Sequence, residues 1–150
     1  MAYTTRLAVP ADRDAIARFN AAMALETESK HLNPQTLTAG VQAVFEDASR
    51  GRYFVAEHPE QGVVGCAMVT FEWSDWRNGQ LWWLQSVYVH PDHRRRGVFA
   101  LIYGAIKQQG DADGAIGYRL YVEHDNTPAK QTYQKLGMCP GGYEVYESIG

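Results

Sequence analysis

A strand, a helix and a second strand follow one another in the second half of the chain, and this order constrains the fold more than any other feature. The sequence predicts strands over 81–89 and 115–122, with an amphipathic helix over 98–109 between them. Two strands joined through a helix lie parallel, because such crossover connections are right-handed and pack back on the sheet. We therefore expect a sheet that contains a parallel pair and carries helices.

Two further helices are expected near the start of the chain. Asp12 is suited to cap the first, in which Ile16, Phe19 and Met23 recur at intervals of three and four residues. The second begins at Asn33–Pro34, a capping residue followed by proline at the first helical position. Both helices carry an apolar stripe, so both are expected to pack on the sheet.

The remaining segments complete a mixed sheet. The sequence predicts antiparallel strands over 53–57 and 63–73, a loop with an Asn78–Gly79 turn over 74–80, a short helix over 128–136 and a last strand over 143–149. The predicted fold class is α/β, with a mixed, mostly antiparallel central sheet and flanking helices. The 150 residues are enough for one substantial core and too few for two, so a single domain over 1–150 is expected.

Composition and charge exclude several classes of protein. No apolar run approaches the roughly 20 residues that span a bilayer, and the N-terminus lacks the apolar core of a secretory signal. Cys66 and Cys139 are too few for a disulfide framework, so a reducing cytoplasm is the expected compartment. The formal net charge of -3 disfavours a general nucleic-acid binder, since phosphate affinity favours positive charge.

The loop between the strand 81–89 and the helix 98–109 carries three arginines, Arg94–Arg96, followed by Gly97. The first turn of a helix leaves N–H groups without partners, and the helix dipole adds positive charge there. Glycine allows a ligand to approach the backbone closely. The loop therefore predicts a phosphate or diphosphate site, although it is neither a Walker loop nor a paired-glycine dinucleotide fingerprint. The alternative is an ordinary solvated loop.

A second segment makes the interpretation of this loop more specific. It contains Asn126, Ala129 and Tyr133, followed by Gly137–Met138. Together with Arg94–Phe99, this pattern resembles the GCN5-related N-acetyltransferase (GNAT) superfamily, whose loop is written Arg/Gln-x-x-Gly-x-Gly/Ala. Element order and length agree as well, so the resemblance covers essentially the whole chain. Phe99 departs from the small residue usual in the family, and its ring either narrows the approach to the cofactor or turns into the core.

The resemblance implies the GNAT fold, in which the parallel strand pair splays apart to admit acetyl-CoA. The pantetheine is then expected along the backbone of Val87, Tyr88 and Val89, because main-chain pairing fixes register without particular side chains. The residues implied for the diphosphate are Arg94, Arg95, Arg96, Gly97, Val98 and Phe99, while Asn126 and Tyr133 are implied near the pantetheine arm and the thiol. No metal is expected, since His90 and His93 lack a third ligand.

The family's reaction is direct attack of an amine on the thioester. A backbone N–H near Val87 is the expected oxyanion donor, and Tyr133 the expected acid. Free tyrosine titrates near ~10 and a free thiol near ~8.5, so Tyr133 is expected to act mainly as a hydrogen-bond donor to the thiolate. The alternative is a core tyrosine. Glu26 and Glu28 are the candidate bases, and Glu72 and Gln85 are also considered; each is alternatively an ordinary surface side chain.

The acceptor is expected near Glu72, Trp73, Asp75, Trp76 and Gln85, because aromatic faces beside carboxylates suit a cationic amine. The alternative, of equal weight, is that these tryptophans pack against a sheet face or in a dimer interface. The predicted function is N-acetyl transfer to a primary amine of a small molecule or peptide, with no nucleic-acid or membrane partner. A homodimer is compatible with exposed aromatic strands. The alternatives are a non-catalytic acyl-CoA-binding regulatory module and an anion-binding protein that uses Arg94–Arg96 on nucleic acid.

Overall fold

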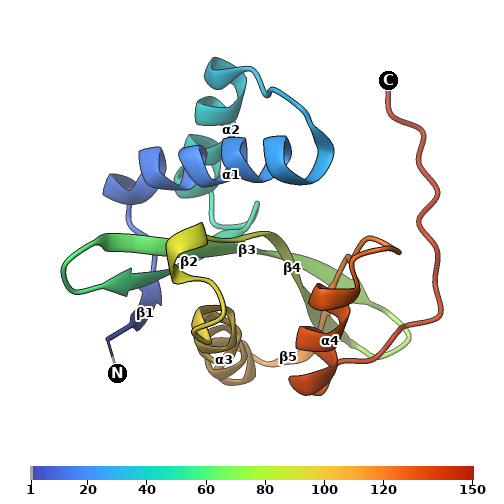
Figure 1. The fold of residues 1–150 in the computed structure, drawn as a ribbon. Coiled ribbons are helices and arrows are strands. Elements are labelled where there is room, and N and C mark those ends of the chain that lie inside the picture. Colours follow the sequence, from blue (N-terminus) through green and yellow to red (C-terminus); the bar gives the residue numbers. More distant parts are fainter. Residues whose placement is uncertain (1) are drawn as a thin grey trace.

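The computed structural model describes residues 2–150, which form a five-stranded sheet with helices on both faces (Figure 1). The strands lie in the order β1 (Thr4–Leu7), β2 (Arg52–His58), β3 (Gly62–Ser74), β4 (Gly79–Val89) and β5 (Ala115–Leu120). The helices are α1 (Arg13–Glu28), α2 (Pro34–Glu46), α3 (Val98–Ala112) and α4 (Thr127–Lys135), with short 3-10 turns at Pro10–Asp12 and Pro91–His93. Neighbouring strands are antiparallel except β4 and β5, which are parallel. The predicted mixed α/β sheet is confirmed.

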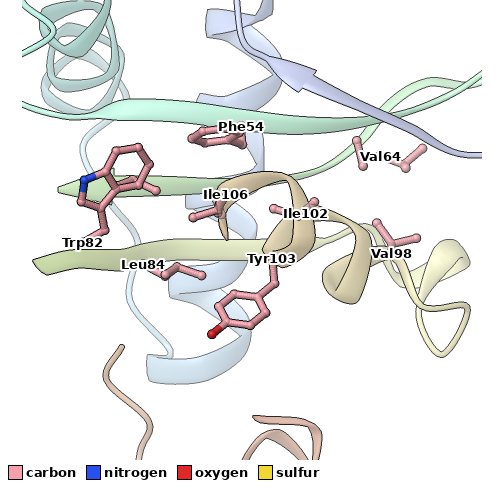
Figure 2. Close-up of a cluster of buried hydrophobic side chains, with 11 residues drawn as sticks. Phe54, Val64, Trp82, Leu84, Val98, Ile102, Tyr103 and Ile106 are labelled. Atoms are coloured by element: carbon pink, nitrogen blue, oxygen red, sulfur yellow. The ribbon is translucent and has the colours of Figure 1, made fainter. Parts of the chain in front are cut away.

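Helices α1 and α2 cover one face of the sheet and α3 covers the other (Figure 1). The apolar stripe of α3 packs on side chains of the central strands, as Figure 2 shows; the labelled members are Phe54, Val64, Trp82, Leu84, Val98, Ile102, Tyr103 and Ile106. Because side chains alternate along a strand, Trp82 and Leu84 face α3, whereas Trp83 and Gln85 face the side of α1 and α2. No helix among residues 2–150 has the length and apolar character of a membrane span.

The parallel strands separate at one end of the sheet. β4 and β5 pair from Gln80 and Ala115 to Leu84 and Leu120, where β5 ends, while β4 runs on to Val89. Among the residues that the structure describes, the last part of β4, residues 85–89, therefore has no strand on its β5 side. This is the place where a splayed pair was expected.

A β-bulge interrupts β4 within this unpaired end. The register with β3 steps from Tyr88 opposite Cys66 to Gln85 opposite Met68, so two residues of β4 stand opposite Ala67 alone. One of them, Ser86, has a positive φ of 51°. A bulge leaves its extra residue outside the regular ladder, and here the Ser86 carbonyl accepts a hydrogen bond from the Cys66 thiol at 3.7 Å.

One predicted strand is wrong, and one observed strand was not predicted. The predicted last strand over 143–149 is absent, because the chain after α4 is extended but pairs with no neighbour within the described residues. Conversely, β1 was not predicted, although it pairs with β2 over its whole length, with Arg6 opposite Val55. The predicted loop over 74–80 is a shorter turn, since Ser74 and Gly79 already pair. Strand propensity indicates an extended chain, and only pairing makes it a strand.

Asp12 does not cap α1, contrary to the sequence analysis. Its carboxylate accepts two hydrogen bonds from Arg6, at 2.7 and 3.0 Å, and one from the Val9 amide at 2.8 Å. These bonds tie β1 to the start of α1. Asn33 does cap α2, since its side chain accepts from the Thr36 amide at 3.0 Å, as the Asn–Pro pattern predicted.

Candidate active site

The loop between β4 and α3 presents a row of unused backbone N–H groups. Arg95 and Gly97 both have left-handed backbone conformations, with φ of 63° and 78°, and no side chain of the described residues caps α3. Within residues 2–150, no backbone N–H from Arg95 to Ala100 donates a hydrogen bond. Turns that mix left-handed with ordinary conformations point successive N–H groups into a concave anion site, and the helix dipole strengthens it. The geometry therefore suits a diphosphate.

His93 anchors the start of this loop. Its ring is buried, with Nδ1 2.8 Å from the Tyr3 hydroxyl and Nε2 2.6 Å from Oε1 of Gln61. Burial, together with the neighbouring His58 and Arg96, lowers the pKa of His93. In the part of the chain that the structure describes, no three His, Cys, Asp or Glu side chains are placed to hold a metal ion. His93 was expected to hold no metal, and its anchoring role was not predicted from the sequence.

Arg94 points back to α1 rather than along the loop. Its Nη2 donates to Oε1 of Glu26 at 2.9 Å, and its Nε donates to the Val89 carbonyl at 2.8 Å. The guanidinium also lies 5.2 Å from the centre of the Tyr88 ring, whose hydroxyl donates to the second oxygen of Glu26. The structure thus joins Glu26 and Arg94 in one ion pair, although the sequence analysis gave them separate roles.

This arrangement shifts the pKa of both partners of the hydrogen bond between Tyr88 and Glu26. The Tyr88 hydroxyl and the Arg94 guanidinium lower the pKa of Glu26, so Glu26 is a weaker base than a free glutamate. Burial and the Glu26 carboxylate raise the pKa of Tyr88 to about 12. Glu28 lies outside the cluster and pairs with Lys30 at 3.3 Å on the surface.

A second polar cluster lies on the sheet face that α1 and α2 share. Glu72 of β3 accepts hydrogen bonds from Nε1 of Trp83 at 2.8 Å and from Nη1 of Arg119 at 3.0 Å, and these bonds lower the pKa of Glu72. Next to it, Nε2 of Gln85 donates to the Thr70 hydroxyl at 2.6 Å. Of the predicted acceptor residues, the structure brings Glu72 and Gln85 together on this face.

The other predicted acceptor residues lie elsewhere. Trp73, Asp75 and Trp76 lie at the β3–β4 turn, where Asp75 accepts a hydrogen bond from the Trp76 amide at 2.8 Å. Trp76 is 92% exposed. Because β4 has 11 residues, this turn is about 30 Å from the Arg94 loop at a rise of about 3.3 Å per residue. The structure does not bring these three residues to the loop.

Phe99 turns towards the core, which was one of the two alternatives for this departure from the family pattern. Its ring stacks on Tyr103, with centroids 6.1 Å apart, and meets the Tyr133 ring edge-on at 5.6 Å. Burial raises the pKa of Tyr133, and its hydroxyl makes no hydrogen bond within the described part of the chain. The Asn126 side chain accepts from the Ala129 amide at 3.2 Å and so caps α4.

Comparisons with known proteins agree with this geometry. Residues 19–138 match the family described as "Acetyltransferase (GNAT) family". The chain is similar to a "possible acetyltransferase" from Clostridium difficile 630, whose structure has been solved. The two sequences are 42% identical, the match covers 100% of this chain and 99% of the other, and the TM-score is 0.89. A transcriptional regulator from Bacillus halodurans C-125, 17% identical with a TM-score of 0.84 and coverage of 98% and 99%, shares the fold. No curated protein matches. The family match spans most of the chain and coincides with the loop, so the chain belongs to the GNAT acetyltransferase family.

Proposed function

We propose that this protein transfers the acetyl group of acetyl-CoA to a primary amine of a small molecule or peptide, by direct attack of the amine on the thioester. The observation that carries the proposal is the row of unused N–H groups from Arg95 to Ala100, directly after the unpaired end of β4. The proposed compartment is a reducing cytoplasm, in keeping with the free thiols of Cys66 and Cys139.

The residues present fit coenzyme A. The N–H groups of Gly97, Val98 and Phe99 suit the diphosphate, and the exposed Arg95 and Arg96 add positive charge. Residues 85–89 of β4 suit the amides of the pantetheine arm, because an unpaired strand edge accepts one more extended chain. Asn126 keeps its side-chain nitrogen available for the same arm, since only its oxygen is used in capping.

We assign two groups to the stabilisation of charge during the transfer. The bulge at Ser86 and Val87 frees backbone N–H groups from the ladder, and we assign one of them to the developing oxyanion. Acetyl-CoA supplies an activated acyl group and a thiolate leaving group. We assign the Tyr133 hydroxyl as donor to that thiolate, since burial raises the pKa of Tyr133 and keeps the hydroxyl protonated.

The amine proton leaves through water rather than directly to Glu26 or Glu72. Hydrogen-bond donors lower the pKa of both Glu26 and Glu72, so each is poorly suited to take a proton from an ammonium group. Gln85 is neutral and is proposed to position the acceptor or its water. The rate is therefore expected to depend on the pKa of the amine itself.

The function is tested by incubating the protein with acetyl-CoA and a panel of primary amines, amino acids, polyamines and short peptides. Free thiol is measured as a function of pH. We expect at least one amine to accelerate thiol release, with a rate that rises with pH towards that amine's own pKa. Tight coenzyme A binding without acceleration by any amine would favour the non-catalytic regulatory module instead.

The ion pair between Glu26 and Arg94 leads to a second expectation. If Glu26 holds Arg94 away from the diphosphate, Glu26→Gln releases the guanidinium, and calorimetry should find coenzyme A binding about two- to fivefold tighter. This magnitude corresponds to the ~1 kcal/mol or less of a surface ion pair. Arg94→Gln serves as the control background, since it removes the partner. If Glu26→Gln raises coenzyme A affinity by the same factor in the Arg94→Gln variant, Glu26 acts through its charge and not by holding Arg94. Weaker coenzyme A binding in Glu26→Gln alone would contradict the proposal that Glu26 competes with the diphosphate for Arg94.

A further inference from the structure

A cavity of about 310 Å³ lies between the sheet and the helices α1 and α2, on the face opposite α3 (Figure 1). Its floor is a row of residues across three strands, with Tyr53 of β2, Met68 of β3 and Ser86 of β4. Tyr53 and Met68 pair directly, and Ser86 is one of the two residues in the bulge of β4. The cavity therefore reaches the strand end that we assign to the thioester.

The lining of this cavity is uncharged. Helix α2 contributes the apolar side chains of Leu37, Val41 and Val44, which add to that of Met68 on the floor. Of the described residues that line the cavity, none is an Asp, Glu, Lys, Arg or His. The volume suits a small ligand, and an ammonium group placed here would lose water without gaining a counter-charge. The buried part of an occupant is therefore expected to be uncharged and largely apolar.

Two polar groups in the lining have no partner within residues 2–150. Asn20 and Tyr53 are only 8% and 6% exposed, and Nδ2 of Asn20 donates to the Ile16 carbonyl at 3.1 Å. Neither Oδ1 of Asn20 nor the Tyr53 hydroxyl makes a hydrogen bond there, although buried polar groups normally do. Every fully buried side-chain N or O atom among these residues has a partner, so the two unpartnered atoms are open to the cavity. Burial raises the pKa of Tyr53 to about 12, which keeps its hydroxyl protonated.

We propose that this cavity is a specificity pocket for the acceptor, and that the acceptor is a primary amine whose small, apolar, uncharged body carries one hydroxyl. The inference rests on the proposed function, since Ser86 joins the cavity to the strand end assigned to the thioester. A hydroxyl both donates and accepts, so it suits the Asn20 oxygen, which only accepts, and the Tyr53 hydroxyl. The amine nitrogen forms the amide bond as the C–S bond breaks, and its proton leaves to water.

The class of acceptor is tested with three amines. Tyramine has an aromatic body and a hydroxyl, phenethylamine lacks the hydroxyl, and 1,5-diaminopentane carries a second ammonium group. We expect kcat/KM for tyramine to exceed that for 1,5-diaminopentane at least about tenfold, because the second charge would be buried unpaired. Tyr53→Phe is expected to raise the KM of tyramine about fivefold and to leave the KM of phenethylamine within about twofold, since it removes only a hydrogen-bonding group.

The position of the pocket is tested at Gly40. This residue of α2 lines the cavity, and a Cβ added to it meets no other atom within 4 Å. Gly40→Leu is therefore expected to fill the cavity and weaken tyramine binding at least about tenfold, with coenzyme A affinity changed less than about twofold. Gly104→Leu is the matched control, because Gly104 of α3 has equally open space and lies outside the cavity. Neither variant should lower the thermal unfolding temperature, since leucine favours a helix more than glycine does.

Calorimetry of tyramine with the full chain in the presence of coenzyme A measures the pocket without turnover. Tyramine binding that Gly40→Leu weakens and Gly104→Leu does not would support the pocket even if no amine were acetylated, and the missing acetylation would count against the proposed function alone. Transfer to 1,5-diaminopentane as efficient as to tyramine, or tyramine binding that Gly40→Leu leaves unchanged, would overturn the pocket while the proposed function stands. Failure of both tyramine and phenethylamine to bind would overturn it as well.

Discussion

Replacing Gly97 by aspartate is expected to weaken coenzyme A binding at least about 100-fold while the fold remains intact. A side chain at Gly97 enters open space, and aspartate tolerates the left-handed backbone there better than most residues. Its carboxylate would cap the free N–H groups of α3 and repel the diphosphate. Two like charges about 4 Å apart cost about 4 kcal/mol at an effective dielectric constant of about 20, and each 1.4 kcal/mol is about tenfold in affinity.

Gly97→Asn is the matched control, because asparagine has the same shape and backbone strain without the charge. We expect it to weaken binding about tenfold or less. Calorimetry with coenzyme A measures both affinities, and thermal unfolding checks that both variants fold like the parent, since capping offsets the backbone strain. Equal losses in the two variants would assign the effect to shape rather than charge, and unchanged binding in both would remove the diphosphate from this loop.

Tyr133→Phe is expected to lower kcat about 100-fold with coenzyme A affinity changed less than about twofold. The substitution removes a hydroxyl that makes no hydrogen bond within the described residues and keeps the ring that meets Phe99. General acid catalysis typically raises the rate about 10²–10⁴-fold. Because the pKa of Tyr133 is raised, its contribution to the rate is expected at the lower end of this range. Steady-state kinetics with the best amine of the panel and calorimetry with coenzyme A separate the two quantities.

Tyr103→Phe is the control for this variant. Tyr103, which like Phe99 belongs to α3, also stacks on the Phe99 ring, so its substitution makes the same chemical change in the same aromatic cluster. We expect its kcat to stay within about twofold of the parent. If Tyr133→Phe lost coenzyme A affinity as severely as turnover, Tyr133 would be a packing residue, and the thiolate would need another donor.

Features that depend on a few consecutive residues were predictable. The Asn33–Pro34 start of α2 and the start of α3 directly after Gly97 both lie where the sequence analysis placed them. The crossover between β4 and β5 was also predictable, because its handedness and direction follow from a strand–helix–strand order. Capping and crossover rules are local, so they hold before any tertiary contact is known.

The candidate site was only partly predictable for the same reason. The loop with its free N–H groups follows from adjacent residues, and so does the position of Tyr133 on α4. The pairing of Glu26 with Arg94 joins residues 68 positions apart, and the contact between His93 and Tyr3 joins residues 90 apart. No spacing rule connects such residues, so a carboxylate expected to act as a base was found in an ion pair.

The C-terminal tail, residues 143–149, shows which features follow from neighbouring residues and which depend on tertiary contacts. Alternating side chains already specify an extended conformation for residues 143–149, just as they specify the order of strands and helices and the anion-binding loop. Whether an extended segment becomes a strand depends on a neighbour that satisfies its N–H and C=O groups, and β1 has one while the tail has none among residues 2–150. Conformational preference is a property of neighbouring residues, whereas ion pairs, strand partners and pKa values arise from distant residues that packing brings together. The amino-acid order was therefore sufficient for the architecture and the diphosphate loop, and the three-dimensional packing was needed for the charge state of Glu26, the anchoring by His93 and the unpaired tail.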